Sequence, residues 1–362
     1  MEKTDPTIHN LSGSEKEMLK NYKYNCEDHS FIANHILKYY WTWISKFFPS
    51  WIAPNLITLM GLVCMIISMM VTILFDPMLI GKGGRLLPLS NGILLFMYST
   101  FDNVDGKQAR RTGEMTPLGQ LMDHGVDSLC CFFSLIGLAS SLRLGTTFDS
   151  ICLLFCLLIC FYGAAVEEHF TNIFRLGIVN GATEGIIAGV IVHLLASTGC
   201  TEFTWLRQPL PLISISNISF ISILFMIAFN ILTIMQIPQK ARFKAFLILF
   251  RIYLLFFSMI IYYSRCSFYL TFFTLMFNFA LMGTLTVFSH LIHRSVPHIT
   301  PPMGLFILGS VITLFIPPSK PYISYLNFLH SIIVYFVNII AIIRTITKIL
   351  DIKVFKIRNK SK

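Results

Sequence analysis

Apolar stretches of about 20 residues recur along most of this sequence, and they restrict its fold more than any other feature. A helix of that length crosses the roughly 30 Å hydrocarbon layer of a membrane. Charged residues make up 13% of the chain, about half the share found in soluble proteins. The sequence therefore predicts an all-α, polytopic membrane protein with about ten transmembrane helices. The expected spans are 56–75, 86–107, 117–142, 149–167, 182–199, 216–236, 244–264, 267–291, 300–317 and 322–348.

Before the first span, residues 31–48 place apolar and aromatic side chains at helical spacing. Trp41, Trp43 and Trp51 lie close together there, and tryptophan collects at the headgroup level of membranes. We expect an amphipathic helix that lies on the membrane surface, with an ordinary core helix as the alternative. The expected organisation has three parts. It comprises a cytosolic N-terminal segment with this helix (1–50), one membrane domain (51–348) and a basic cytosolic tail (349–362).

The distribution of positive charge predicts which side of the membrane each loop faces. Most of the 28 Lys and Arg residues lie in the two terminal segments and in the loops expected on the same side as them. Because cytosolic loops carry the excess of Lys and Arg, both termini and the loop at 107–119 are expected in the cytosol. The net charge of +10 then faces anionic headgroups and nucleotide phosphates.

Acidic residues gather at the end of the second expected span and the start of the third. Asp102 and Asp105 are three residues apart, and Asp123 and Asp127 are four apart, so each pair shares one face of a helix. We expect a helical hairpin, joined by a basic turn at 107–119, in which the two pairs face each other. Four carboxylates near an apolar bilayer need neutralisation, which hard divalent cations provide. The alternative is an exposed loop whose acids pair with Lys107, Arg110 and Arg111.

This segment closely resembles the signature of the CDP-alcohol phosphotransferase family, D-x2-D-G-x2-A-R-x8-G-x3-D-x3-D. The matching residues are Asp102, Asp105, Gly106, Ala109, Arg110, Gly119, Asp123 and Asp127. The surrounding short segments GKQARR, TPLG, DHGVDS and SWIAPNLIT resemble those of the eukaryotic cholinephosphotransferases and ethanolaminephosphotransferases. The resemblance extends through Phe161–Gly177, whereas the last 150 residues or so match the family only in hydropathy.

The resemblance implies a site built from the signature residues. Two Mg²⁺ or Mn²⁺ ions are implied, bound by Asp102, Asp105, Asp123 and Asp127. A CDP-alcohol, CDP-ethanolamine or CDP-choline, is implied beside Gly106, Ala109, Arg110, Gly119 and Gln120. Glycines leave room for a nucleotide, and an Arg guanidinium can fork onto phosphate oxygens. Asn55 is either a phosphate or ribose contact or a helix cap.

The implied reaction moves phosphoethanolamine or phosphocholine onto the hydroxyl of diacylglycerol and releases CMP. Either His124 or Asp127 removes the hydroxyl proton. Free imidazole titrates near pH 6.5, so we favour His124 as the base. Gln120 stands where this branch of the family usually has a glutamate that supports the histidine. Glu167 and Glu168 follow the position of a frequent family tryptophan, and a carboxylate there either attracts the ammonium of the alcohol or pairs with Arg175.

Two other functions remain open at this stage. One is a different branch of the family, such as a phosphatidylinositol or phosphatidylglycerophosphate synthase, although those enzymes usually have about six helices. The other is a transporter with buried acids, although no inverted repeat is evident. The family implies a homodimer in the endoplasmic reticulum whose active site faces the cytosol. Besides the CDP-alcohol, the expected partners are diacylglycerol and membrane lipid, and no nucleic acid is expected.

Overall fold

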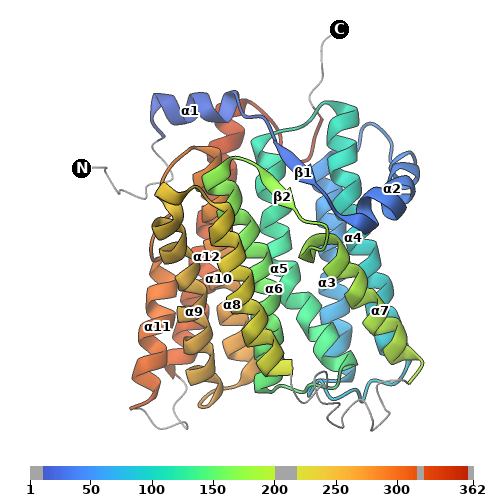
Figure 1. The fold of residues 1–362 in the computed structure, drawn as a ribbon, viewed down its shortest axis with the longest axis vertical. Helices are drawn as coiled ribbons and strands as arrows, with labels where there is room; N and C mark the ends of the chain where they lie inside the picture. Colours follow the sequence, from blue (N-terminus) through green and yellow to red (C-terminus); the bar gives the residue numbers. More distant parts are fainter. Residues whose placement is uncertain (1–10, 200–217, 316–321, 358–362) are drawn as a thin grey trace.

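The computed structural model describes residues 11–199, 218–315 and 322–357. Within these ranges it contains twelve α-helices, and ten of them, α3 to α12, lie side by side in one bundle (Figure 1). Their bounds are α3 (Pro54–Phe75), α4 (Leu86–Thr112), α5 (Pro117–Ser141), α6 (Phe148–Thr171), α7 (Ile186–Ser197), α8 (Ile218–Gln236), α9 (Arg242–Tyr263), α10 (Phe268–Leu291), α11 (Pro301–Thr313) and α12 (Tyr322–Leu350). Each of the ten expected spans corresponds to one of these helices, which confirms the predicted fold class.

Seven of the described helices are long and apolar enough to cross a membrane, namely α3, α5, α6, α8, α9, α10 and α12. The other three differ for separate reasons. The helix α4 is 27 residues long but ends in a charged segment. The helices α7 and α11 have 12 and 13 residues, and a π-helical turn, η2 (Gly181–Gly185), precedes α7. The protein is therefore a polytopic membrane protein whose helices are not all of full spanning length.

The core of the bundle lies where α5, α6 and α10 meet. The phenylalanines Phe132 on α5, Phe155 on α6 and Phe279 on α10 are fully buried. The ring centroids of Phe132 and Phe279 lie 5.8 Å apart, which joins α5 to α10. Because large aromatic side chains fill this space, α5 has a rigid support on the side that faces away from α4.

A close approach of α3 to α4 positions the end of the bundle that carries the acidic residues. A Cβ atom placed on Gly61 of α3 would lie 3.3 Å from the ring carbon Cδ2 of Tyr98 on α4. This separation is tighter than most side chains accept, so the glycine lets the two backbones approach. The approach brings Thr58, one turn before Gly61, into contact with Asp105 on α4.

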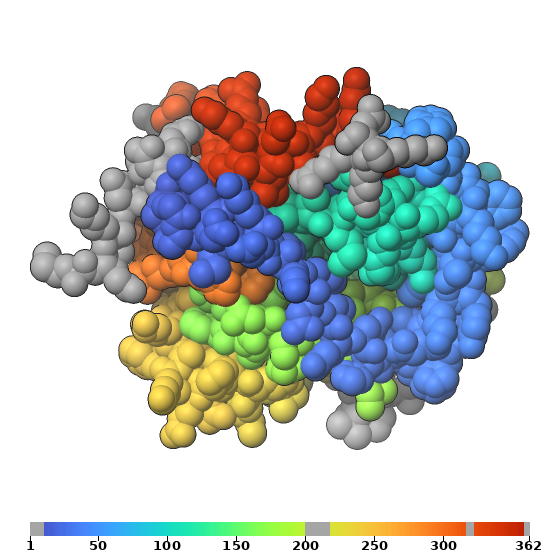
Figure 2. All heavy atoms as spheres, turned by 90° about the horizontal axis from the view of Figure 1, so that it is seen from above, coloured from blue at the N-terminus to red at the C-terminus, as the bar shows by residue number. Residues whose placement is uncertain are grey.

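The N-terminal segment runs across one end of the bundle. It contains α1 (Gly13–Lys20), the strand β1 (Cys26–Asp28), a π-helical turn η1 (Ala33–Leu37) and α2 (Lys38–Ser45). Figure 2 shows this segment in blue, crossing the end face between the end of α12 in red and the light-green segment after α6. A short 3₁₀ turn, η6 (Gln239–Ala241), lies before α9.

A two-stranded parallel sheet joins this segment to the bundle. The strand β1 pairs with β2 (Phe174–Leu176), with Cys26 opposite Phe174 and Asp28 opposite Leu176. The sequence did not predict this sheet, because each strand has only three residues and no apolar alternation. The predicted helix at 31–48 is present as η1 and α2, and four of the Phe, Tyr and Trp side chains in this range are exposed: Phe31, Tyr39, Trp43 and Phe47. Such an exposed aromatic face fits the expected position at a membrane surface.

Candidate active site

The turn between α4 and α5 brings the two acidic pairs together. Gly113 has φ 70°, the left-handed conformation that ends α4 without strain. Pro117 begins α5, and the hydroxyl of Thr116 accepts a hydrogen bond of 3.1 Å from the amide of Gly119. The sequence predicted a turn over 107–119, but α4 continues to Thr112, one residue past Arg111, and the turn itself covers only residues 113–116. The predicted helical hairpin is present.

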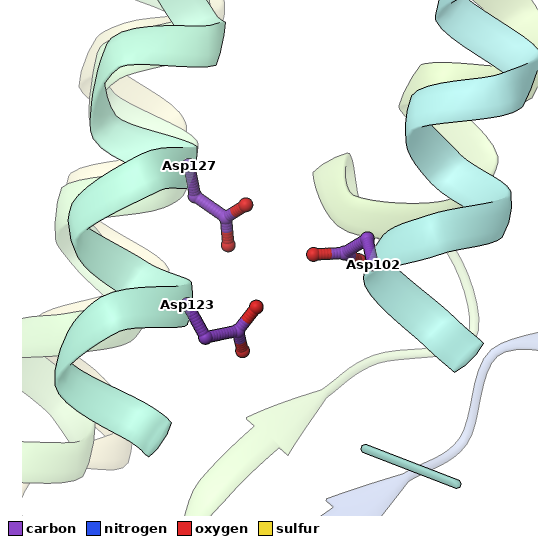
Figure 3. A group of neighbouring side chains, drawn as sticks. All are labelled: Asp102, Asp123 and Asp127. Atoms are coloured by element: carbon purple, nitrogen blue, oxygen red, sulfur yellow. The ribbon is translucent and has the colours of Figure 1, made fainter. Parts of the chain in front are cut away.

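Three aspartates converge across the gap between the two helices. Asp102 extends from α4 toward Asp123 and Asp127 on α5 (Figure 3). Each of the three offers a carboxylate oxygen, and these oxygens all lie within 4.8 Å of one another. The three residues are half-buried. Three carboxylates at this separation repel one another unless a cation neutralises them.

The fourth expected ligand, Asp105, lies one turn further along α4 and is not part of this group of three. It is buried, and the hydroxyl of Thr58 donates a hydrogen bond to its Oδ2. The hydroxyl of Tyr98, also on α4, donates a hydrogen bond of 2.6 Å to Oδ1 of Asp127 on α5. These neutral donors hold two of the four carboxylates in place and leave their charge uncompensated.

The residues present fit a divalent cation. Oδ1 of Asp123 is buried and has no hydrogen-bond partner among the described residues. The basic residues of α4 do not pair with the aspartates in this part of the structure, since Lys107 donates to Thr42 and Arg111 donates to the carbonyl of Phe48. Carboxylate oxygens are the ligands that Mg²⁺, Mn²⁺ and Ca²⁺ prefer. The site can therefore hold a hard divalent metal, of a kind that this geometry does not specify.

The two signature glycines leave open space beside the aspartates. A Cβ atom on Gly106 would meet nothing closer than the guanidinium of Arg110, at 3.7 Å. A Cβ atom on Gly119 would lie 3.6 Å from Oγ1 of Thr116 and 3.8 Å from Oδ1 of Asn55. Neither contact forbids a side chain, and neither glycine has a positive φ. The protein itself does not require glycine there, which fits a ligand that occupies the space.

Arg110 and Ala109 lie on the last turns of α4, where Arg110 is exposed and Ala109 is half-buried. Asn55 lies at the start of α3 and does not cap that helix. Its side-chain amide donates a hydrogen bond of 2.8 Å to the backbone carbonyl of Val354, in the segment after α12. The cap interpretation of Asn55 is therefore wrong, and a role as a ligand contact stays a prediction.

A shallow surface pocket of about 20 Å³ lies beside Asn55. Its lining includes Asn55, Thr116, Lys353 and Lys356. Asn55 is one helical turn from Thr58, and Thr58 contacts Asp105. The pocket therefore lies about one helical turn from the contact between Thr58 and Asp105. Sequence reasoning did not identify the segment 352–357 as part of this surface.

His124 follows Asp123 on α5 and is 4% exposed. Its ring lies against two aromatic side chains, with centroid distances of 5.1 Å to Phe174 and 6.4 Å to Phe161. The ring nitrogen Nδ1 is buried without a hydrogen-bond partner among the described residues. The ring is therefore oriented by packing, and its nitrogens remain available to a substrate.

Both polar atoms of the Gln120 side-chain amide form hydrogen bonds with residues other than His124. Its Nε2 donates a hydrogen bond of 2.6 Å to Oε1 of Glu168 on α6. Its Oε1 accepts a hydrogen bond from the hydroxyl of Tyr22 in the N-terminal segment. The sequence suggested that Gln120 gives a hydrogen bond to the histidine, but the amide joins α6 and the N-terminal segment to α5.

The two neighbouring glutamates of α6 have different partners. Glu167 is buried, and its Oε1 lies 3.5 Å from Nη1 of Arg175, which also pairs with Glu27 at 3.0 Å. Of the two possibilities that the sequence left open, the ion pair with Arg175 is present. Glu168 instead faces Gln120 and His290, whose Nε2 lies 3.7 Å from Oε1 of Glu168.

Sequence reasoning missed three residues that contact this site: Thr58, Tyr98 and Tyr22. Tyr98 lies four residues before Asp102 on α4, so helical spacing contained a signal for it, whereas no spacing marked Thr58, which lies on α3. Adjacent residues on a helix are about 100° apart, so only one of Glu167 and Glu168 can face α5. Nothing in the sequence placed Tyr22, which lies in a segment without regular spacing.

Comparison with known proteins gives a family match for part of the chain. Residues 51–198 match the family model described as CDP-alcohol phosphatidyltransferase. This range includes α3 to α7 and therefore all four signature aspartates. The curated relatives align over a similar share of the chain, and the chain spans about half the length of the relatives it matches.

Three of these relatives differ in their reported activity. A choline/ethanolaminephosphotransferase of Arabidopsis thaliana is 40% identical over 199 residues, covering 54% of this chain and 50% of the relative. A cholinephosphotransferase of Saccharomyces cerevisiae is 38% identical over 187 residues, covering 52% and 48%. A CDP-diacylglycerol–serine O-phosphatidyltransferase of Encephalitozoon cuniculi is 38% identical over 184 residues, covering 51% and 48%.

Proposed function

We propose that this chain, which carries a CDP-alcohol phosphatidyltransferase domain over residues 51–198, transfers phosphoethanolamine or phosphocholine from a CDP-alcohol to diacylglycerol. The observation that carries the proposal is the convergence of Asp102, Asp123 and Asp127 on one point. The phospholipid product is phosphatidylethanolamine or phosphatidylcholine, and CMP is released. The similarity to choline/ethanolaminephosphotransferases supports this choice of substrate.

Phosphoryl transfer requires mainly positioning and neutralisation of charge on the phosphate oxygens. Two Mg²⁺ or Mn²⁺ ions bound in the proposed site would neutralise the negative charge of the diphosphate. Asp102, Asp105, Asp123 and Asp127 would hold these ions. The open space beside Gly106 and Gly119 would take the nucleotide, with Arg110 and Asn55 near its phosphates or ribose.

In the proposed step, the hydroxyl oxygen of diacylglycerol forms a bond to the phosphorus that bears the alcohol. The bond from that phosphorus to the bridging oxygen breaks, and this oxygen leaves as part of CMP. His124 takes the hydroxyl proton, because its Nδ1 is free of hydrogen bonds within the described residues. Asp127 is less suited to this role, since it already accepts a hydrogen bond from Tyr98 and belongs to the aspartate group.

The proposed membrane arrangement follows the distribution of charge. The acidic centre and the basic ends of α4 and α12 lie at the end of the bundle that carries α1. We place this end in the cytosol, by the excess of Lys and Arg. Diacylglycerol would enter laterally from the bilayer. A homodimer in the endoplasmic reticulum remains part of the proposal, on the resemblance alone.

A second candidate function comes from the Encephalitozoon cuniculi relative, which transfers to serine from CDP-diacylglycerol. In that reaction the lipid is on the nucleotide and the small alcohol is the acceptor. The same aspartate group suits either of the two reactions, because both transfer a phosphoryl group from a CDP carrier. The similarity of 38% is close to that of the choline enzymes, so identity alone does not separate the two.

CMP release from the purified protein in detergent separates these functions. The protein would be given Mg²⁺ or Mn²⁺ with CDP-ethanolamine and diacylglycerol, with CDP-choline and diacylglycerol, or with CDP-diacylglycerol and serine. The proposal expects lipid-dependent CMP release in one or both of the first two mixtures. Release only in the third mixture supports the serine reaction, and no release in any mixture contradicts both candidates.

A further inference from the structure

Glu168 is a buried carboxylate whose charge has no permanent counter-ion. It is 2% exposed, and among the described residues no Lys or Arg lies within ion-pair distance of it. Its two observed contacts, the amide of Gln120 and the ring of His290, both go to the same oxygen, Oε1. Buried glutamates are seldom unpaired, because an isolated charge in an apolar interior is costly.

The second oxygen of this carboxylate, Oε2, makes no hydrogen bond within the described part of the chain. The ring of His290 lies beside this carboxylate, and the ring of His169 lies 6.5 Å from that of His290. Nδ1 of each of these two rings is buried without a partner in that part of the chain. Buried polar atoms normally have partners, so these unfilled positions beside Glu168 point to a missing polar ligand.

The acidic centre lies close to this cluster along α5. Gln120, which holds Glu168, precedes Asp123 by three residues and so lies on the same side of the helix, roughly 4.5 Å along its axis. Tyr24 of the N-terminal segment lies near both places. Burial raises the pKa of Tyr24, and the charges of Asp123 and Glu168 raise that pKa further. The charges of Asp123 and of Glu168 therefore both act on the same tyrosine.

We propose that Glu168 binds the ammonium group of the CDP-alcohol and is a specificity-determining residue for the reaction. This inference rests on the proposed function. With the phosphate at the aspartate group, the two-carbon linker of an amino alcohol spans about one helical turn, roughly 5 Å, toward Glu168. The ammonium supplies the missing positive charge, and its contact with Oε2 is a charge-assisted interaction. A CDP-alcohol without a positive charge makes no such charge-assisted contact with Glu168, so Glu168 does not increase its affinity.

The ammonium contact is assigned to Glu168 and not to its neighbour Glu167. Glu167 already has a cationic partner in Arg175. Glu168 has none, and it faces α5, where the signature aspartates lie. The two residues thus form a matched pair for an experiment: both are buried glutamates on α6, and only one is expected to contact the substrate.

The test compares Glu168→Gln with Glu167→Gln in the purified full chain. The measurements are kcat and KM for CDP-ethanolamine, and the inhibition constants of CMP and of CDP-glycerol, which lack an ammonium group. Glutamine at 168 can still accept the hydrogen bond from Gln120, so it removes charge with little change of shape. We expect Glu168→Gln to raise the KM for CDP-ethanolamine at least tenfold, with about the same inhibition constants for CMP and CDP-glycerol.

In Glu167→Gln, any change in affinity is expected to be equal for CDP-ethanolamine and CDP-glycerol, because that variant loses only an internal ion pair. Glu168→Asp is a second variant that keeps the charge, and it should recover part of the affinity for CDP-ethanolamine. The inference is overturned if Glu168→Gln weakens CMP and CDP-ethanolamine equally, if it leaves the KM unchanged, or if Glu167→Gln gives the selective loss. These outcomes are separate from failure of the proposed function, in which the wild-type protein itself releases no CMP from a CDP-alcohol.

Discussion

The side-chain amide of Asn55, at the start of α3, donates a hydrogen bond of 2.8 Å to the backbone carbonyl of Val354, which follows α12. This bond joins residues 299 positions apart in the sequence. Ile352 and Val354 also pack beside Leu118 at the start of α5. The segment after α12 is thus held against the start of α3, beside the open space at Gly119 proposed for the nucleotide.

Asn55→Asp should loosen this segment and weaken nucleotide binding. The substitution puts a carboxylate against the carbonyl of Val354, so one hydrogen bond of about 1 kcal/mol is lost and repulsion is added. We expect the inhibition constant of CMP to rise about fivefold or more, with faster proteolysis after residue 351. Val354→Ala is the matched control, since it keeps the backbone carbonyl. Equal CMP inhibition in Asn55→Asp and in the wild type would show that Asn55 has no part in the pocket.

Tyr98→Phe should reduce turnover and leave nucleotide affinity nearly unchanged. The hydroxyl of Tyr98 holds Oδ1 of Asp127, and a hydrogen bond to a charged group contributes about 1.5–3 kcal/mol. Without it, Asp127 is free to rotate away from Asp102 and Asp123. We expect kcat to fall about tenfold or more and the metal concentration for half-maximal activity to rise. A variant with wild-type kcat and metal dependence would contradict the role given to this contact.

The contact between Glu15 and Arg294 should fasten α1 to the bundle in a pH-dependent way. Burial alone raises the pKa of Glu15, but the hydrogen bonds and charge of Arg294 and Ser12 outweigh it and lower that pKa. A lowered folded-state pKa means that the contact stabilises the docked helix at neutral pH and that this contribution is lost as the pH falls through the folded-state pKa.

Proteolysis within α1 would measure this effect. In the wild type, cleavage near Lys16 and Lys20 should be slow at pH 7 and faster below pH of about 4, the ordinary range of glutamate titration. Arg294→Gln should show fast cleavage already at pH 7, with a weaker dependence on pH. Identical profiles for the two proteins would show that this ion pair does not hold α1.

Cysteine labelling in sealed membranes would test the orientation. In a background with Cys26 and Cys200 replaced by serine, Met115→Cys lies in the α4–α5 turn and Thr146→Cys lies at the opposite end of α5. We expect an impermeant reagent to label Met115→Cys from the cytosolic side and Thr146→Cys only after the membrane is opened. The reverse pattern would invert the assignment of both ends of the bundle.

The acidic hairpin and the number of helices were predictable because both depend on local spacing. Runs of about 20 apolar residues define the helices, and the separations between Asp102 and Asp105 and between Asp123 and Asp127 put each pair on one helix face. The extent of α4 was less predictable. Its last turns are basic and lie beyond the apolar run, and only Gly113 marks where the helix ends.

The contacts made by the chain's two terminal segments were not predictable from spacing. The strands β1 and β2 have three residues each and are polar or mixed, so no periodicity identifies them. Tyr22 reaches Gln120 over 98 positions, and Asn55 reaches Val354 over 299. Such pairings depend on the packing of the whole bundle. The choice between Glu167 and Glu168 depends on the rotation of α6 about its axis, which the sequence leaves open by about 100°.

The central claim is that the converging aspartates hold the metal on which phosphoryl transfer depends. The most direct measurement is CMP release from CDP-ethanolamine and diacylglycerol, in EDTA and after addition of Mg²⁺ or Mn²⁺. It would be made for the wild type and for Asp102→Ala, Asp105→Ala, Asp123→Ala and Asp127→Ala. We predict that EDTA abolishes wild-type activity, that either metal restores it, and that each variant is at least about 100-fold slower. Full activity in EDTA, or near-normal turnover in the Asp102, Asp123 and Asp127 variants, would contradict the claim.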